Sequence, residues 1–233
     1  MRPLVIIPVK NHLEFTAPLV RALWAQSVSA GDADLIVYDN GSTDQTREWL
    51  GEFGVECVDT KGWTLHQMWN DGLNQADPQQ PVVILNNDLK LDGKPDWLGR
   101  LCKPFKGGWG ALCPNYDARP TYRAVDSLEK KGVSGGVENG KGGLSGFAFA
   151  MSPQVVGWYR FPADLKWWFG DTDLVWALEA NGYQCGLVAD VGVTHLGGGS
   201  QTAKDYDLND ICKKDHATWR AKWRPEEEPC EAS

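Results

Sequence analysis

The first half of the chain repeats one pattern, in which a short run of mostly apolar residues ends in polar residues and is followed by a segment with helical spacing. The runs fall at residues 4–7, 35–38, 55–58 and 82–85. Runs of this length, rich in β-branched residues, are typical of strands buried on both faces of a parallel sheet. The segments between them carry apolar residues at intervals of three and four, as helices with one buried face do. The alternation predicts an α/β fold whose parallel sheet is covered by helices.

Three positions in this half carry signals for the start of a helix. Thr16 can cap one helix. Ser42 and Thr64 can cap two others, because Gln45 and Gln67 follow them at the spacing of a capping box. We therefore expect a helix after each of the first three strands.

The second half of the chain is less regular. Its pattern predicts helices near 97–105, from 171 to 181 and over 205–223, and strands near 111–113, 146–151 and 185–189, with a short helix starting at Ser152 and Pro153. Residues 114–145 are polar and rich in glycine, which predicts a mobile stretch that is either a functional lid or a long surface loop. The acidic segment 225–233 is predicted to be a disordered tail.

Composition sets bounds on size, charge and location. With 233 residues, 42% of them hydrophobic, the chain can form one large domain with a sizeable core. A formal net charge of −8 disfavours nucleic acid or an anionic membrane surface as a partner. The six cysteines form no Cys-x-x-Cys pair, no apolar run could span a membrane, and the first apolar run is too short for a signal peptide. These observations predict a cytoplasmic protein with reduced thiols.

Polar residues at strand ends are the first candidates for chemistry. Asp88 and Asp39 each follow a predicted strand, at the carboxyl edge of the sheet where α/β proteins bind ligands. Asp88 lies beside Asn86 and Asn87 and could hold a hard cation that also needs ligand oxygens and water. Asp39 could accept a hydrogen bond from the imide N–H of a uracil-like base. Either aspartate could instead be an ordinary turn residue.

Two common nucleotide-binding motifs are absent from the chain. The exit of the first strand lacks Gly-x-Gly-x-x-Gly, and Gly-Lys-Gly-Gly at 140–143 lacks the Ser or Thr that completes a phosphate loop. The sequence therefore disfavours a Rossmann dehydrogenase and a P-loop enzyme.

Further candidates lie in the second half. Asp171 is in line with the buried face of its predicted helix, and Trp167 and Trp168 just before it offer flat faces on which a sugar can stack. Asp171 and Asp173 could also simply complement the helix macrodipole. His195 precedes three glycines and is a candidate metal ligand, although a lone histidine is more often structural.

Taken in chain order, a series of motifs between about Pro3 and Ser200 resembles the family 2 glycosyltransferases of the GT-A fold. The motifs are Val-Ile-Ile-Pro-Val-Lys-Asn at 5–11, Asp-Asn-Gly-Ser-Thr-Asp at 39–44, Trp-Asn-Asp-Gly at 69–72, Leu-Asn-Asn-Asp at 85–88, Ser-Gly-Phe at 145–147, Gly-Asp-Thr-Asp-Leu at 170–174 and His-Leu-Gly-Gly-Gly-Ser at 195–200.

The resemblance implies a single Rossmann-like nucleotide-binding sheet flanked by helices, with a smaller acceptor-side subregion. One GT-A domain over 1–224 would comprise a donor half (1–113), an acceptor and catalytic half (114–200) and a C-terminal helix (201–224). The implied reaction is metal-dependent, inverting transfer of a sugar from a nucleotide-diphosphate sugar, with UDP favoured. The acceptor would be a hydroxyl of a saccharide, a protein or another molecule.

The resemblance also implies roles for individual residues. Donor-binding positions would be Pro8, Asn11, Asp39, Asn40, Gly41, Asn70 and Asn87. Mn²⁺ or Mg²⁺ would be held by Asp88 and His195, with Asp171 as the general base. Acceptor-side positions would be Gly146, Trp167, Trp168 and Asp173. The chain departs from the family at Asn86, which replaces the first acid of the metal-binding DxD motif, and at Gly170, which replaces a Glu beside the base.

Two other functions would use part of this pattern. A sugar-1-phosphate nucleotidyltransferase also has an α/β nucleotide-binding sheet, but the glycine-rich, arginine-containing loop expected after the first strand is missing. A non-catalytic carbohydrate- or nucleotide-sugar-binding protein would account for the tryptophans. It would not account for four polar side chains at separate loop ends, which are Asp39, Asp88, Asp171 and His195.

Overall fold

The computed structural model describes residues 1–116, 128–130, 144, 146–197 and 207–225. Its strands are β1 Leu4–Val9, β2 Asp34–Asp39, β3 Glu56–Asp59, β4 Val82–Leu85, β5 Leu89–Leu91, β6 Trp109–Tyr116, β7 Leu128–Lys130, β8 Ala148–Met151 and β9 Gln184–His195. Its α-helices are α1 Leu13–Leu23, α2 Thr46–Phe53, α3 Leu65–Gln75, α4 Trp97–Cys102, α5 Pro153–Val156, α6 Gly170–Ala180 and α7 Leu208–Trp223. A π-helical turn, Trp24–Val28, follows α1, and a 3₁₀ turn, Lys103–Gly107, follows α4.

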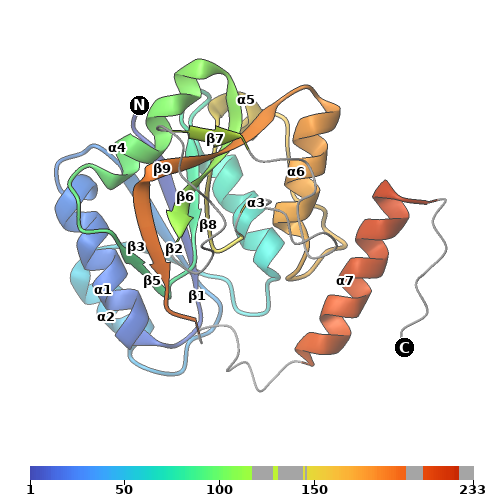
Figure 1. Ribbon diagram of the computed structural model, residues 1–233. Helices are drawn as coiled ribbons and strands as arrows, with labels where there is room; N and C mark the ends of the chain where they lie inside the picture. Colours follow the sequence, from blue (N-terminus) through green and yellow to red (C-terminus); the bar gives the residue numbers. More distant parts are fainter. Residues whose placement is uncertain (117–127, 131–143, 145, 198–206, 226–233) are drawn as a thin grey trace.

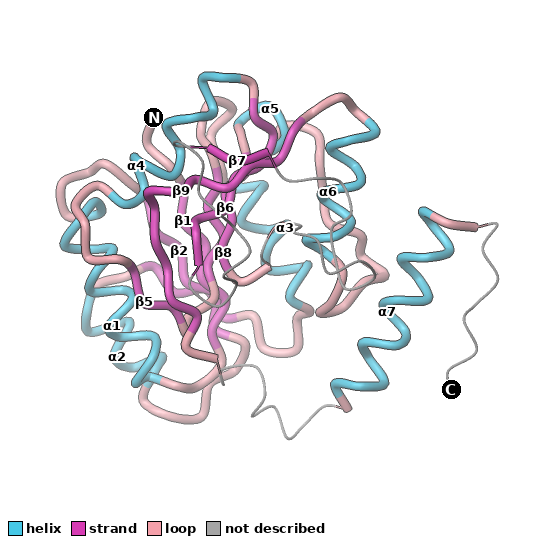
Figure 2. Tube along the Cα trace, viewed as in Figure 1, coloured by secondary structure: helices cyan, strands magenta, loops and turns pink. Residues whose placement is uncertain are grey.

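The nine strands of the described residues form one mixed sheet (Figure 2). Its order is β3-β2-β1-β4-β8-β6-β9-β5, with β7 added beside β9. Strands β1 to β4 pair in parallel, as the alternation of strands and helices predicts, whereas β8 is antiparallel to both β4 and β6. The predicted α/β class is therefore confirmed, and the second half of the chain continues the same sheet.

Helices cover both faces of the sheet because successive side chains of a strand point to opposite sides. In β1, Val5 and Ile7 join one buried cluster, which includes residues of α1, α2 and α4. Leu4 and Ile6 join a second cluster, which includes residues of α3, α5 and α6. Figure 1 shows α1 and α2 on one side of the sheet and α3 and α6 on the other, with α7 outside α6. Within the described residues, no helix is both long enough and apolar enough to cross a membrane.

The first strand and the first helix differ from the prediction. β1 continues through Pro8, which pairs with Tyr38 of β2. The proline is tolerated because β4 pairs only with residues 4–6, so β1 has one neighbour fewer at this point. α1 begins at Leu13, three residues before the predicted cap, and the hydroxyl of Thr16 donates to the carbonyl of His12 inside the helix.

The predicted capping box at Ser42 is wrong, whereas the one at Thr64 is confirmed. α2 begins at Thr46, and the Ser42 hydroxyl instead accepts a hydrogen bond from the N–H of Asn11, 2.7 Å away on a neighbouring loop. A contact between loops thus outcompetes the local cap. For α3, the Thr64 and Gln67 side chains make both bonds of the box.

Strand β9 is much longer than predicted, because it pairs with β5, β6 and β7 along its length. His195 is consequently the last residue of a strand. The stretch 114–145, predicted to be mobile, contains the end of β6 and all of β7, and the rest of it is largely outside the described residues. The predicted disordered tail is also outside them, apart from its first residue. Five cysteines, Cys57, Cys102, Cys113, Cys185 and Cys212, are described and have free thiols.

Candidate active site

Three parallel strands end at the same level along one edge of the sheet. In their register Val9 lies opposite Asp39, and Asp39 lies opposite Asp59. The loops that leave β1, β2 and β3 therefore meet at this edge, and they carry most of the residues predicted to bind the donor.

Asp39 is fully buried, and its two carboxylate oxygens differ in their surroundings. Oδ1 accepts a hydrogen bond of 2.9 Å from the N–H of Ser42. Oδ2 accepts none from the described residues and lies 3.8 Å from Nη1 of Arg47, which pairs more closely with Asp59 at 2.7 Å. A buried carboxylate oxygen without a donor is costly. It suits a ligand that brings its own N–H.

Asn11 and Asn40 shape this edge through bonds within the protein. Asn11 has a left-handed backbone with φ of 59°, and its side-chain oxygen accepts the N–H of Thr43 at 2.7 Å. The Asn40 amide donates to the carbonyls of Thr60 at 3.1 Å and Trp63 at 2.8 Å. Both side chains therefore tie together loops that leave the sheet at this edge.

Pro8 and Gly41 bring backbone to the same edge. Pro8 lies in β1 and is partly exposed. Gly41 has a φ of 78°, and a Cβ there would lie 2.9 Å from Cγ of Lys61. A glycine is therefore needed for the loop to turn closely against Lys61.

Asp88 and His195 come together through the pairing of two strands. Leu89, the first residue of β5, lies opposite His195 at the end of β9, and the N–H of Leu196 donates to the carbonyl of Asp88 at 2.9 Å. This register places Nε2 of His195 3.2 Å from Oδ1 of Asp88, while Phe147 stacks on the imidazole with ring centres 4.3 Å apart.

This pair fits a divalent cation. Neighbouring ligands of an octahedral ion at about 2.1 Å lie about 3 Å apart, close to the separation of the two side-chain atoms. The described residues contain no group of three or more His, Cys, Asp or Glu side chains that could hold a metal ion. Two protein ligands are enough for Mg²⁺ or Mn²⁺ when phosphate oxygens and water complete the shell.

The two asparagines before Asp88 hold its loop in place. The buried Asn87 donates from Nδ2 to the hydroxyl of Thr16 at 3.0 Å, which fastens the loop to α1. The N–H of Asn86 donates to the carbonyl of Phe147 at 2.8 Å. The side chain of Asn87 therefore faces α1.

Asp171 is partly buried at the first turn of α6. Its Oδ1 accepts the N–H of Thr172 at 2.8 Å, and a Cβ on Gly146 would lie 2.9 Å from its Oδ2. Burial raises the pKa of this carboxyl group, while backbone hydrogen bonds from Thr172 and Gly146 oppose the rise. A carboxylate with a raised pKa is a stronger proton acceptor than an ordinary one.

The glycine before Asp171 makes room for a buried histidine. A Cβ on Gly170 would lie 2.3 Å from Nε2 of His66. Nδ1 of His66 is bonded to the carbonyl of Leu165 at 2.7 Å, so Nδ1 carries the proton and Nε2 has no partner among the described residues. Burial lowers the pKa of His66, which keeps the ring neutral. The space that a larger residue at 170 would need is thus filled by imidazole.

The segment before α6 is fastened to α3. Both polar atoms of the Asn70 side chain make hydrogen bonds with the backbone of Phe161. Nδ2 donates to its carbonyl and Oδ1 accepts from its N–H, each at 2.8 Å. Asn70 therefore joins α3 to the segment before α6. The two predicted sugar platforms differ, because Trp167 packs against the core whereas Trp168 is 41% exposed.

Asp173 is fully buried in a network that joins α6 to α7. Its Oδ2 accepts the hydroxyl of Tyr159 at 2.8 Å, and its Oδ1 accepts Nζ of Lys222 at 2.6 Å and Nε1 of Trp223 at 2.7 Å. Burial raises the pKa of Tyr159 far above its usual range, so its hydroxyl remains a donor. Every bond described for this carboxylate is structural.

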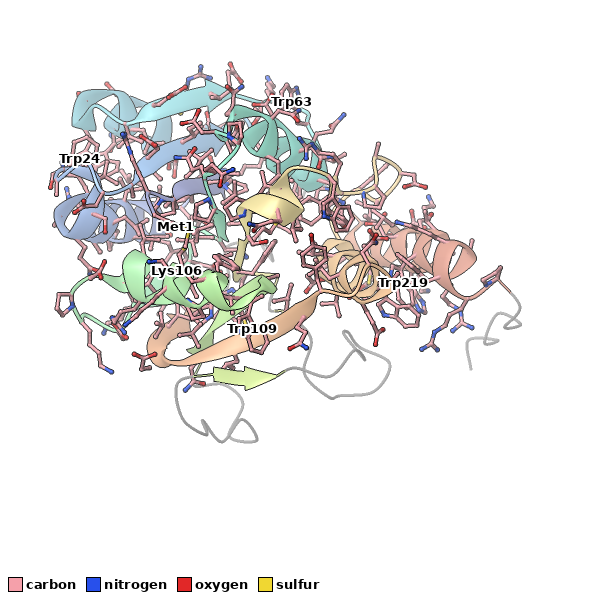
Figure 3. All side chains as sticks on the ribbon, turned by 90° about the horizontal axis from the view of Figure 1, so that it is seen from above. Met1, Trp24, Trp63, Lys106, Trp109 and Trp219 are labelled. Carbon is pink, nitrogen blue, oxygen red and sulfur yellow. The ribbon has the colours of Figure 1, made fainter. Side chains whose placement is uncertain are left out.

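One hollow lies elsewhere on the molecule. It has a volume of about 520 Å³ and is lined by Arg100, Lys103, Pro104, Gly107, Trp109, Val188 and Asp190. Figure 3 labels Trp109, which lies on a different part of the molecule from Trp63, whose carbonyl contacts Asn40 at the end of β2. None of the predicted site residues lines this hollow.

Comparison with known proteins identifies the family. The sequence model described as glycosyl transferase family 2 matches residues 4–141, which is more than half of the chain. The chain belongs to glycosyl transferase family 2. No curated protein sequence matches this family 2 chain.

Solved glycosyltransferases share the fold of this family 2 chain. A structure of GalNAc-T7 with UDP, GalNAc and Mn²⁺ has a TM-score of 0.67 and 14% identity, over 84% of this chain and 44% of that one. Mannosyltransferase PcManGT from Pyrobaculum calidifontis with GDP-Man and Mn²⁺ gives 0.65 and 19%, over 86% and 59%. Glucosyl-3-phosphoglycerate synthase from Mycobacterium tuberculosis with Mn²⁺, UDP and phosphoglyceric acid gives 0.67 and 16%, over 95% and 78%. These similarities show the GT-A fold.

The family 2 chain spans 44% and 59% of the length of the first two of these proteins. Sequence reasoning missed two residues that contact the segment before α6, His66 and Asp215. Both fall on the buried stripe of a helix, where His66 precedes Trp69 by three positions and Asp215 precedes Trp219 by four. A polar residue in an apolar stripe was the signal that could have found them.

Proposed function

We propose that this protein is an inverting glycosyltransferase that transfers a sugar from a nucleotide-diphosphate sugar to an acceptor hydroxyl with the help of a divalent cation. The observation that carries the proposal is the 3.2 Å approach of Asp88 and His195, which come from distant parts of the chain. Structural neighbours with UDP or GDP-Man and Mn²⁺ support a nucleotide-sugar donor and favour Mn²⁺ over Mg²⁺.

On the donor side, Asp39 reads the base. Its buried Oδ2 accepts an N–H from the ligand, and the imide N–H of uracil supplies one, so a UDP-sugar is the favoured donor. Asn11, Asn40 and Gly41 hold the loops that surround this carboxylate. Recognition of the base therefore depends on one charged acceptor, Asp39, whose surrounding loops are already held in place by the protein.

On the phosphate side, Asp88 and His195 are the protein ligands for Mn²⁺ or Mg²⁺. When bound there, the cation supplies Lewis-acid stabilisation of the charge that develops on the diphosphate leaving group. Phe147 stacks on the imidazole and so fixes the plane of the ring. Asn86 stands where the DxD motif has its first acid. The site therefore carries less negative charge, and His195 provides its second ligand.

On the acceptor side, Asp171 is the general base. Its carboxylate takes the proton of the acceptor hydroxyl as that oxygen bonds to the anomeric carbon and the bond to the diphosphate oxygen breaks. A single displacement of this kind inverts the anomeric centre. The exposed Trp168, three residues earlier, offers the face on which an acceptor saccharide stacks.

The test is release of UDP from UDP-glucose, UDP-N-acetylglucosamine and other nucleotide sugars, measured with Mn²⁺ and then with an excess of chelator. Metal-dependent release that rises when candidate glycoside acceptors are added supports a transferase. Tight donor binding without any release would support a non-catalytic nucleotide-sugar-binding protein instead. Inverted configuration at the anomeric carbon of the product, read by proton NMR, tests the single displacement.

A further inference from the structure

Asp215 of α7 holds the backbone of the segment that leads to the proposed base. Asp215 is 2% exposed, and its carboxylate accepts the N–H groups of three successive residues. Lys166 donates at 3.1 Å and 3.2 Å to its two oxygens, and Trp167 and Trp168 each donate to Oδ2 at 2.9 Å. Hydrogen bonds to an ionised acceptor are stronger than neutral ones. The Asp215 side chain of α7 thus holds the backbone of residues 166–168 in one conformation.

The next residue, Phe169, has a backbone conformation that side chains seldom adopt. Its φ is 62°, in the left-handed region, and it is the N-cap residue of α6 immediately before Gly170 and Asp171. Strained residues of this kind persist only where the surroundings hold them, and they cluster at functional sites. The surroundings here belong to α7, because the ring of Phe169 stacks on His216 at 5.0 Å and on Trp219 at 5.9 Å.

A second anchor lies beyond the proposed base. Asp173 accepts hydrogen bonds from Lys222 and Trp223 at the C-terminal end of α7. Between the two anchors, Trp219 meets Trp176 of α6 with ring centres 5.4 Å apart, and Figure 3 shows Trp219 where α7 faces α6. Asp171 is therefore flanked in the sequence by residues that α7 holds on both sides.

We propose that α7 positions the acceptor side of the active site, with Asp215 as the positioning residue that orders the Trp167–Trp168 segment and, through Phe169, the base Asp171. This inference rests on the proposed function and extends it to a helix beyond the segment matched by the family model. Asp215 touches no reacting atom, so it acts only through the backbone that it holds. Its loss is expected to disturb acceptor use and to leave donor binding intact.

The chain offers a matched control on the same helix. Asp210 is exposed and pairs with Lys214 at 2.6 Å, one turn away. Asp215→Asn and Asp210→Asn remove the same charge from the same element, but only the first replaces the charged acceptor of three N–H groups by a single neutral oxygen. Phe169→Gly is the second test variant, because glycine adopts the left-handed conformation without strain and deletes the stacking on α7.

Three quantities are measured for each variant: hydrogen exchange of the peptide that spans residues 164–173, affinity for UDP with Mn²⁺, and release of UDP from UDP-glucose with and without p-nitrophenyl glycosides as acceptors. For Asp215→Asn we expect faster exchange and unchanged UDP affinity. Acceptor-dependent release should fall by about 10- to 100-fold, the effect of displacing a catalytic group by about 1 Å. Phe169→Gly should show the same split, and Asp210→Asn should match the wild type.

Unchanged exchange in Asp215→Asn, or acceptor-dependent release equal to that of the wild type, would overturn the positioning role. An equal loss of UDP affinity and of all release would also overturn it, because that result means general destabilisation. If the wild type releases no UDP from any donor, the proposed function fails. The exchange comparison would then still decide whether Asp215 orders this segment.

Discussion

Replacing Asp171 by asparagine separates a catalytic role from a structural one. Asparagine keeps the size of the side chain and one oxygen, so it can retain the 2.8 Å bond from the N–H of Thr172. It cannot also accept from the backbone of Gly146, which bonds to the carboxylate in the wild type. The lost bond to the ionised carboxylate costs about 1.5 to 3 kcal/mol, and removal of a buried charge offsets part of this cost. The folded protein should therefore remain intact.

Turnover should respond far more strongly than stability. Loss of a positioned proton acceptor lowers the rate by about 10² to 10⁴, which corresponds to about 3 to 5.5 kcal/mol in the activation free energy. If Asp171 only complemented the dipole of α6, the cost would stay at about 0.3 to 1 kcal/mol of stability, with little change in rate. The two roles thus predict rates that differ by at least an order of magnitude.

The raised pKa of Asp171 adds a test by pH. Activity needs the ionised carboxylate, so the acid limb of the kcat profile should lie above the ordinary aspartate pKa of about 3.9 and should be absent from the residual activity of Asp171→Asn. Because the folded-state pKa is above the unfolded one, the carboxyl contributes stability below about pH 3.9 that is lost as the pH rises through the folded-state pKa. At neutral pH, removal of this charge in Asp171→Asn should therefore make a favourable contribution to the free energy of unfolding. This contribution should vanish in acid, where the wild-type carboxyl group is protonated.

The assay is product formation with donor and acceptor both saturating, read beside the melting temperature. The exposed Asp164, seven residues earlier, provides the control variant Asp164→Asn, which should behave as wild type. Near-wild-type turnover by Asp171→Asn would refute the assignment of the base. A larger loss of turnover in Asp173→Asn, measured at a temperature at which both variants are folded, would move the base by two residues.

Three further predictions follow from single contacts. Asp88→Ala should abolish Mn²⁺-dependent UDP release and the rise in melting temperature that Mn²⁺ gives the wild type, since it removes one of two ligands 3.2 Å apart; retention of either response would contradict the metal site. Asp39→Ala should weaken UDP binding by about 1.5 to 3 kcal/mol without altering the metal requirement, as measured by calorimetry, and equal affinity would make Asp39 a turn residue. Asp173→Asn should lower the melting temperature by about 3 to 12 °C, because it removes the charged acceptor of Tyr159, Lys222 and Trp223; an unchanged value in a thermal scan would show that this network does not anchor α7.

Local patterns explain which elements of the fold could be predicted. β4 has the predicted bounds, and the cap of α3 is the predicted one, because both follow from residues close together in the sequence. The capping box at Ser42 failed because its hydroxyl is taken by Asn11, which belongs to another loop. The length of β9 also escaped prediction, since three other strands determine it.

The same division holds at the site. The sequence by itself determined the α/β class, the family and the polar residues at strand ends, because hydrophobic periodicity and short motifs are local properties. Only the tertiary structure decided which of those residues meet. The pairing of β5 with β9 brings His195 to Asp88, and the packing of α7 gives Asp173 a structural partner and Asp215 three N–H groups to hold. Such contacts depend on strand register and helix packing between distant segments, which no local spacing encodes.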